Sequence, residues 1–134
     1  MTTPDVDRLR RVPLFADLDG AALQRVAELA TEFEAPSGHV LMERGQAGTG
    51  VFIIEEGSVR VELPHDDDVT LGPGEFVGEL SVLADTPRSA RVCVHEDLRA
   101  LAIRRGDLDA LLEREPPIAL AMLRGVARRF AGHL

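Results

Sequence analysis

The residues of this chain best suited to bind a ligand lie in one segment, PGEFVGELSVLADTPRSARV, at residues 73–92. Gly78 permits a close backbone approach at the end of a strand. The following GELSVL predicts a short helix whose first N–H groups favour an anion. Nine residues after Glu79, Arg88 supplies a planar guanidinium that can pair with two oxygens of a phosphate. The segment therefore predicts a phosphate site.

Glu79 needs its own explanation, because a carboxylate repels an anion. It can assist binding if it accepts a hydrogen bond from a neutral hydroxyl beside the phosphate, and a ribose 2′-hydroxyl has that chemistry. Ser89 and nearby backbone amides would complete the phosphate shell, and a cyclic 3′,5′-nucleotide carries both groups. In isolation, a glutamate and an arginine at this spacing would more often form an exposed ion pair worth less than about 1 kcal/mol. The interpretation therefore depends on the surrounding pattern.

Hydrophobic periodicity predicts the elements that position these residues. Residues 17–30, DLDGAALQRVAELA, predict an amphipathic helix that Asp17 or Asp19 can cap. From residue 33 to 104 the chain changes to short β-branched runs separated by turn residues, which is typical of an all-β roll or sandwich. Its runs include HVLME, GVFIIEEG, SVRVEL, ARVCV and LRALAI. Two helices follow, the first capped by Asp107 and the second beginning at the prolines of PPIALAMLRGVARRFAGHL.

The last of these helices carries two apolar stripes. One consists of Leu120, Leu123, Ala127, Phe130 and Leu134, and the other of Ile118, Met122 and Val126. Either both stripes form one wide face packed on the rest of the domain, or one docks on the roll and the other on a partner such as a second copy. The pattern leaves both alternatives open, and Gly125 weakens the helix.

Composition excludes several classes of function. A length of 134 residues fits one domain, and a formal charge of −8 argues against binding to a nucleic-acid backbone. The single cysteine, Cys93, cannot form a disulfide within the chain and is expected to be buried and reduced. No signal peptide is apparent and no apolar run approaches the roughly 20 residues of a membrane span. We therefore expect a soluble, cytoplasmic protein without a membrane partner.

The chain also offers little for catalysis. His65 and three aspartates in LPHDDDVT are expected to form a solvated hairpin tip rather than a metal site. His39, His95 and His133 are expected at the surface, and no histidine pair has metal-ligand spacing. A metal-dependent jelly-roll enzyme would need paired histidines and a carboxylate, and no serine or cysteine has a plausible local base. We expect no enzyme, no metal and no cofactor.

The ligand segment closely resembles the phosphate-binding cassette of the cyclic-nucleotide-binding family, which includes the bacterial catabolite activator protein and protein kinase A regulatory subunits. The Gly-Glu pair, the Arg-Ser-Ala triplet and their spacing recur together in that family. The resemblance extends to VPLFADLDGAALQRVA and GQAGTGVFIIEEGSVRV. It also implies that Gly45 and Gly57 are structural glycines in hairpin turns.

The resemblance implies specific roles for the cassette residues. Glu79 would hold the ribose 2′-hydroxyl, and Arg88 and Ser89 the cyclic phosphate. Backbone contacts would come from Gly78, Leu80, Ser81 and Ala90. Base contacts would fall at about His133 and Leu134, and a serine after the arginine favours cAMP over cGMP.

The expected fold is α+β and mainly β: a β-roll or jelly roll of about eight antiparallel strands, an N-terminal helical segment, a short cassette helix and two C-terminal helices. It forms one domain over residues 1–134, with helices in 1–32, the roll in 33–104, the cassette in 76–90 and the last helices in 105–134. The expected function is that of a stand-alone sensor, without a DNA-binding domain, that signals through movement of the terminal helices. The alternative is a ligand-free protein-protein interaction domain that retains the fold.

Overall fold

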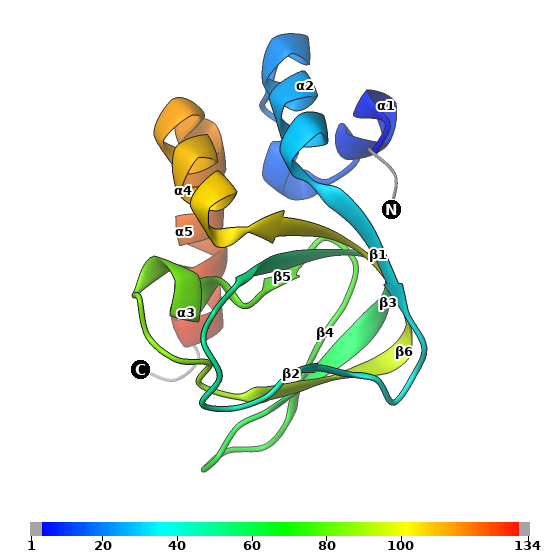
Figure 1. The fold of residues 1–134 in the computed structure, drawn as a ribbon, viewed down its shortest axis with the longest axis vertical. Helices are drawn as coiled ribbons and strands as arrows, with labels where there is room; N and C mark the ends of the chain where they lie inside the picture. Colours follow the sequence, from blue (N-terminus) through cyan, green and yellow to red (C-terminus); the bar gives the residue numbers. More distant parts are fainter. Residues whose placement is uncertain (1–3, 132–134) are drawn as a thin grey trace.

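The computed structural model describes residues 4–131, apart from the side chains of Leu80 and Phe130, and has a β-roll with helices at one end and along one side (Figure 1). The helical elements are α1 (Val6–Leu9), η1 (Pro13–Phe15), α2 (Gly20–Leu29), α3 (Glu79–Leu83), α4 (Arg105–Arg114) and α5 (Pro116–Ala131). The strands are β1 (Thr31–Ala35), β2 (Val40–Met42), β3 (Gly50–Glu62), β4 (Val69–Leu71), β5 (Phe76–Val77) and β6 (Arg91–Arg104). The α+β, mainly β fold is confirmed, and the roll begins two residues earlier than the predicted boundary.

Two long antiparallel strands, β3 and β6, form the frame of the sheet. They pair from Gly50 opposite Arg104 to Glu62 opposite Arg91. Strands β1 and β2 pair with β6, and β4 and β5 pair with β3, all of them antiparallel. Every strand of the described chain therefore joins directly to β3 or β6.

The expectation of about eight strands is wrong, since the described residues form a sheet of six. The runs GVFIIEEG and SVRVEL belong to one strand, β3, and ARVCV and LRALAI both belong to β6. Gly57 lies inside β3 with a φ of +82°, where the register with β6 shifts. The glycine therefore bends a continuous strand instead of forming a hairpin turn, which corrects its predicted place. A Cβ there would lie 2.0 Å from the carbonyl oxygen of Asp97, so only glycine fits.

The helix starts were predicted with mixed success. Asp19 is the N-cap of α2, and its carboxylate accepts a hydrogen bond from the amide of Ala22 at 2.8 Å. The predicted cap by Asp107 is wrong: α4 follows β6 directly, with Arg104 at the N-cap position and no side-chain cap. Asp107 instead lies in the first turn, where its negative charge interacts favourably with the positive end of the helix dipole. The prolines do begin α5 as expected.

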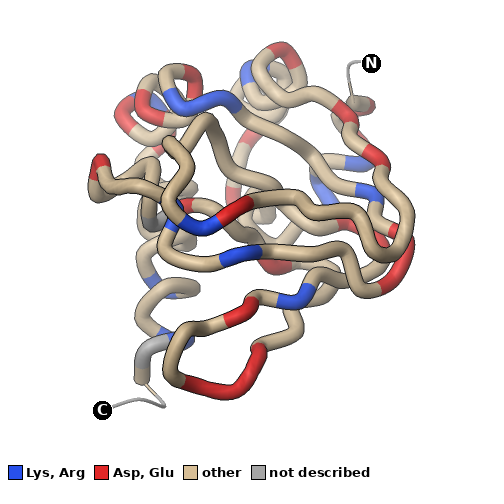
Figure 2. Tube along the Cα trace, turned by 60° about the horizontal axis from the view of Figure 1, so that its bottom comes forward, with Lys and Arg blue, Asp and Glu red and all other residues tan. Residues whose placement is uncertain are grey.

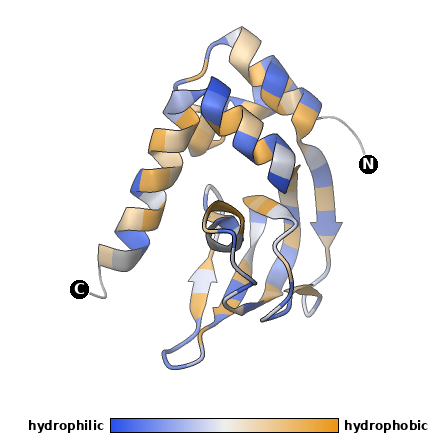
Figure 3. Ribbon diagram, turned by 60° about the vertical axis from the view of Figure 1, so that its left-hand side comes forward, coloured by the Kyte–Doolittle hydropathy of each residue, from blue (hydrophilic) through white to orange (hydrophobic). Residues whose placement is uncertain are grey.

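The core consists of two apolar clusters that share β3 and β6. One cluster packs the helices against the end of these strands that contains Val51 and Ile103, and the other fills the roll around Ile54 and Val94. Hydrophobic and hydrophilic residues alternate along α5 (Figure 3). Its stripe of Ile118, Met122 and Val126 packs on the first cluster.

The described side chains of the second stripe, those of Leu120, Leu123 and Ala127, are exposed. Leu120 is 46% exposed and Leu123 is 65% exposed, so the alternative in which both stripes pack on their own domain is wrong for these residues. Gly125 faces the ring of Phe76, and a Cβ there would lie 2.8 Å from Cε1. This glycine allows α5 to approach β5 closely, a role that its helix propensity did not reveal.

Charged residues of both signs are spread over the surface of the roll (Figure 2). Residues 64–68, which include His65 and the three aspartates, are exposed on the connection between β3 and β4, as predicted for a hairpin tip. His39 and His95 are exposed, although His95 lies within β6 rather than at a strand end, and Cys93 is buried and free. Within residues 4–131, no helix combines the length and apolar character needed to cross a bilayer.

Candidate ligand-binding site

The predicted binding segment leaves the sheet after β5, forms the short helix α3 and returns to β6. The first residue after β5, Gly78, has a φ of +95°, a conformation that side-chain-bearing residues adopt only with strain. A Cβ there would lie 2.7 Å from both Arg88 Nη1 and Met42 Cε. The glycine therefore both turns the chain into α3 and leaves space for the arginine.

Arg88 is buried, with only 6% of its surface exposed, and its charged side chain is held in place by hydrogen bonds to backbone and side-chain acceptors. Its Nη1 donates to the carbonyl of Gly78 and to Ser81 Oγ, both at 2.8 Å, and Nη2 donates to the carbonyl of Gly50 at 2.9 Å. Burial lowers the pKa of the guanidinium and nearby Glu79 raises it, with a net lowering. These hydrogen bonds fix the orientation of the guanidinium within the cassette.

A turn before β3 fixes the backbone of Arg88 as well. The amide of Gly45 donates to the carbonyl of Arg88 at 2.8 Å, and the amide of Arg88 donates to the carbonyl of Gln46 at 2.7 Å. Gly45 has a φ of +87°, which agrees with its predicted place in a turn, although β2 and β3 are not paired with each other there. The turn therefore fixes the backbone of Arg88 through both its amide and its carbonyl.

Glu79 begins α3 and is 3% exposed. Its Oε1 accepts a hydrogen bond from Arg129 Nη1 at 2.6 Å, and Arg129 comes from α5, the last helix. Burial raises the pKa of the Glu79 carboxyl, although Arg129, a backbone hydrogen bond and Arg88 all act to lower it. Arg129 also donates to the carbonyl of Phe76 and lies 4.6 Å from the centre of that ring.

Glu79 and Arg88 line the same cavity, which has a volume of about 220 Å³. Six of the seven predicted binding residues line it: Gly78, Glu79, Ser81, Arg88, Ser89 and Ala90. The side chain of the seventh, Leu80, lies outside the described residues. The charged groups gather at one part of the cavity, with Arg129 beside Glu79. The remaining lining side chains are apolar and come mostly from the roll: Met42, Val61, Leu63, Val69, Leu71, Val77 and Val92.

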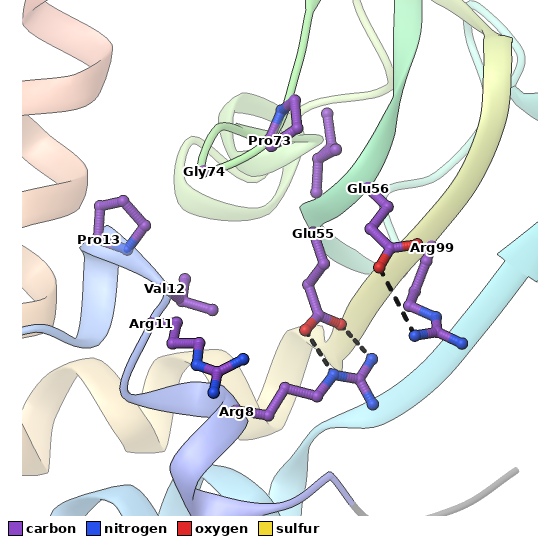
Figure 4. Close-up of a pocket in the computed structure, with 10 residues that line it drawn as sticks. Arg8, Arg11, Val12, Pro13, Glu55, Glu56, Pro73, Gly74 and Arg99 are labelled. Atoms are coloured by element: carbon purple, nitrogen blue, oxygen red, sulfur yellow. Dashed lines mark hydrogen bonds and ion pairs between the residues drawn. The ribbon is translucent and has the colours of Figure 1, made fainter.

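A second cavity, of about 460 Å³, lies between the N-terminal helices and β3 (Figure 4). Arg8 there makes ion pairs with Glu55 and Glu32, and Arg99 pairs with Glu56. Two of the three arginines that line this cavity, Arg8 and Arg99, already face carboxylates, so they are less available to an anion. No residue of the cassette lines it, so it is a weaker candidate for ligand binding.

The chain also matches the model of a known protein family. The family model for the cyclic nucleotide-binding domain matches residues 32–115, which span most of the sheet, α3 and α4. The chain belongs to the cyclic nucleotide-binding domain family. Solved structures that share the fold of this cyclic nucleotide-binding domain include the catabolite activator protein and the regulatory domain of protein kinase A.

Two relatives of this cyclic nucleotide-binding domain are described as cyclic nucleotide-gated potassium channels. The protein from Rhizobium etli is 34% identical over 121 residues, which cover 90% of this chain and 34% of the channel. The protein from Mesorhizobium japonicum is 35% identical over 108 residues, which cover 81% of this chain and 30% of the channel. The chain thus spans about a third of the length of these curated relatives.

A solved structure, the catabolite activator protein of Thermus thermophilus, has the same fold. It superposes with a TM-score of 0.77 at 29% identity, covering 90% of this chain and 59% of that chain. The likeness covers nine-tenths of this chain, so it supports the fold predicted for the cyclic nucleotide-binding domain.

Sequence reasoning did not identify Arg129 as part of the site. The arginine lies 50 residues from Glu79 along the chain, and no local spacing predicts that contact. Two consecutive arginines on the otherwise amphipathic last helix were the available signal. His133 and Leu134, the predicted base contacts, lie outside the described residues.

Proposed function

We propose that this domain binds a cyclic nucleotide, with cAMP preferred over cGMP, as a regulatory module that carries out no chemistry on it. The observation that carries the proposal is the convergence of Arg88 and Glu79, both nearly fully buried, on one cavity. Arg88 and Ser89 bind the cyclic phosphate, and Glu79 accepts a hydrogen bond from the ribose 2′-hydroxyl. Backbone groups complete the contacts at Gly78, Leu80, Ser81 and Ala90.

The chemistry of the cavity supports this assignment. A cyclic phosphodiester is a monoanion, and Arg88 is a permanent cation that is already oriented by Gly78, Ser81 and Gly50. Little ordering of this side chain remains to be done when the ligand binds. The apolar lining from the roll, with Val61 and Leu71 among its members, provides a surface against which a flat base can pack.

The preference for cAMP rests on two features. Ser89 follows the cassette arginine, and in this family a serine there fits cAMP binders whereas a threonine is often associated with cGMP. The apolar lining side chains offer no hydrogen-bond partner to the extra polar groups of guanine. Burying those groups without partners costs free energy, so the base is expected to be adenine.

The output of the module is movement of the C-terminal helix α5. Support comes from the hydrogen bond between Glu79, the residue proposed to bind the ribose, and Arg129 on α5. We further propose that residues 1–134 form a single domain, because both core clusters share β3 and β6. Motion of α5 would then occur against a fixed frame.

The test is titration calorimetry of the purified chain with cAMP, cGMP and 2′-deoxy-cAMP. We expect cAMP to bind more tightly than cGMP, and loss of the 2′-hydroxyl to weaken binding by about 10- to 150-fold, as for a hydrogen bond to a charged group worth about 1.5–3 kcal/mol. Glu79→Gln should show the same loss, and Glu113→Gln, an exposed residue of α4, serves as the charge-matched control. At about a hundred times its dissociation constant, cAMP should stabilise the fold by roughly 2.7 kcal/mol. A melting temperature that does not change with millimolar cAMP or cGMP would overturn the proposal.

The second candidate function is a ligand-free interaction domain that pairs through α5. Leu120 and Leu123 are exposed there, and such residues on one helix face are suited to a second copy or another protein. Light scattering of the wild type and of Leu123→Glu tests for a self-associated form that the charge disrupts. If that form exists and Arg88→Ala changes neither nucleotide binding nor association, the interaction function replaces the first proposal.

A further inference from the structure

The hydroxyl of Ser81 is buried within the cassette, where it accepts a hydrogen bond from Arg88. Ser81 is 3% exposed, and its Oγ lies 2.8 Å from Arg88 Nη1. A guanidinium has five N–H groups. Within residues 4–131, both N–H groups of Nη1 and one of Nη2 are donated to the protein, to Gly78 O, Ser81 Oγ and Gly50 O. Nε and the second N–H of Nη2 therefore remain for a ligand.

Ser81 is itself held in place by the cassette backbone. Its Oγ donates to the carbonyl of Gly78 at 3.2 Å, and its own carbonyl accepts a hydrogen bond from the amide of Thr86 at 3.1 Å. Asp85, the residue before Thr86, has a φ of +56°. A left-handed residue followed by a hydrogen bond back to the last turn is the Schellman ending of a helix, so the end of α3 is closed at Ser81.

Gly48 limits the space of Ser81 from another part of the chain. Gly48 is buried in the turn before β3, and Gly45 and Gln46 of the same turn bond to the backbone of Arg88. A Cβ at Gly48 would clash with Ser81 Oγ and lie 2.9 Å from Ser81 Cβ. Rotation of the hydroxyl is the least costly way to make room, and this rotation would remove the hydroxyl from Arg88.

We propose that Ser81 is a positioning residue of the nucleotide site: its hydroxyl holds Nη1 of Arg88, and Gly48 leaves the space that keeps the hydroxyl there. This inference rests on the proposed function. With Nη1 held, Nε and the free N–H of Nη2 meet the phosphate in one orientation, so the side chain loses little freedom on binding. Without the hydroxyl, one N–H of Nη1 is buried without an acceptor, and the guanidinium turns to satisfy it elsewhere.

The experiment compares Ser81→Ala with Ser58→Ala. Ser58 is the matched control, because it is 4% exposed and its Oγ donates to Glu96 at 2.9 Å, in the sheet. Titration calorimetry with cAMP should show a loss of affinity of about three- to tenfold for Ser81→Ala, as for the ordering of one long side chain on binding, and less than about twofold for Ser58→Ala. Circular dichroism verifies that each variant is folded.

A ligand without the 2′-hydroxyl separates positioning of Arg88 from a general disturbance of α3. Because Ser81 acts through the phosphate contact, Ser81→Ala should weaken the binding of 2′-deoxy-cAMP by the same factor as that of cAMP. A loss confined to cAMP would mean that the substitution disturbs Glu79 at the start of the helix. That result, or an unchanged affinity of Ser81→Ala for cAMP, would overturn the inference.

The role of Gly48 is tested by adding a methyl group. Gly48→Ala should weaken cAMP binding by a factor similar to that of Ser81→Ala, whereas Gly20→Ala, with nothing within 4 Å of the added Cβ, should not. In the Ser81→Ala background, Gly48→Ala should cost less affinity, because the hydroxyl that it displaces is already gone. An equal cost in both backgrounds would show that Gly48 does not act through Ser81.

A further measurement tests the contact without a ligand. In NMR spectra of isotope-labelled wild type, the N–H signals of Arg88 Nη1 should be resolved, because hydrogen bonds slow the rotation of the guanidinium. They should exchange faster in Ser81→Ala and remain unchanged in Ser58→Ala. If Ser81→Ala leaves them unchanged, the inference is wrong. If the wild type binds no cyclic nucleotide, the proposed function fails, while these signals still decide whether Ser81 holds Arg88.

Discussion

Replacing Arg88 with lysine separates the charge of the nucleotide site from its geometry. In the wild type the guanidinium reaches three acceptors within the protein, which are Gly78 O, Ser81 Oγ and Gly50 O. It lines the cavity while doing so. A lysine ammonium carries the same charge but is a single point with three donors, so it cannot reproduce the planar fork.

The expected magnitude follows from the hydrogen bonds that are lost. If the guanidinium makes two charge-assisted bonds to the phosphate and lysine retains about one, the loss is about 1.5–3 kcal/mol, or roughly 10- to 150-fold in affinity for cAMP. The buried carbonyl of Gly50 would also lose its donor, at a cost of about 1–3 kcal/mol in the free energy of unfolding. Both quantities should therefore fall together.

Titration calorimetry measures the affinity for cAMP, and urea denaturation measures the free energy of unfolding. Circular dichroism verifies that the variant is folded. Arg99→Lys is the matched control, because Arg99 lies on the surface of β6, where its side chain is 44% exposed and pairs with Glu34 and Glu56. Its affinity for cAMP should remain within about twofold of wild type. A folded Arg88→Lys that binds cAMP as tightly as the wild type would refute the reasoning, because charge alone would then suffice.

Three further predictions concern the elements around the site. Gly57→Ala should lower the free energy of unfolding by more than about 2 kcal/mol, because Gly57 has a positive φ and an added Cβ would clash with Asp97 O. Gly106→Ala in α4 should raise it slightly, because alanine has the higher helix propensity and nothing lies near the added Cβ. Urea denaturation measures both variants. Gly125→Ala should destabilise by about 1 kcal/mol, because overpacking against Phe76 outweighs the gain in helix propensity, and a rise in melting temperature would contradict this. The raised pKa of Glu79 means that the folded state holds its proton more tightly than the unfolded chain, so this group's contribution to stability is present at low pH and is lost as pH rises through the folded pKa. The free energy of unfolding of the wild type minus that of Glu79→Gln should therefore decrease between about pH 4 and pH 7. A difference that increases with pH would contradict the raised pKa of Glu79.

The cassette could be predicted from the sequence because its groups are close together along the chain. Gly78 and Glu79 are adjacent, and Arg88 follows within the same connection between β5 and β6. The helices were also visible, since periodicity and the cap at Asp19 are local properties. These features need no knowledge of the rest of the fold.

The errors arose where contacts distant in sequence decide the structure. Gly57 resembles a strand terminator, but pairing with β6 carries the strand through the bend. Asp107 was a plausible cap, but β6 continues to Arg104 and α4 begins at once, which moves Asp107 into the first turn. The partner of Glu79 depends on where α5 crosses the cassette, and only the folded chain supplies that information.

The binding segment is attached to the same strand at both of its ends. Val77 of β5 pairs with Phe52 of β3, and Arg91 of β6 pairs with Glu62 of β3, so residues 78–90 connect two strands that are both paired with β3. Because the entropy of closing this loop is already lost when the ladder forms, its exposed tip at residues 83–87 can change length or sequence at small additional cost. Changes within residues 78–90 can thus alter the affinity and kinetics of ligand binding without altering the sheet to which this segment is attached.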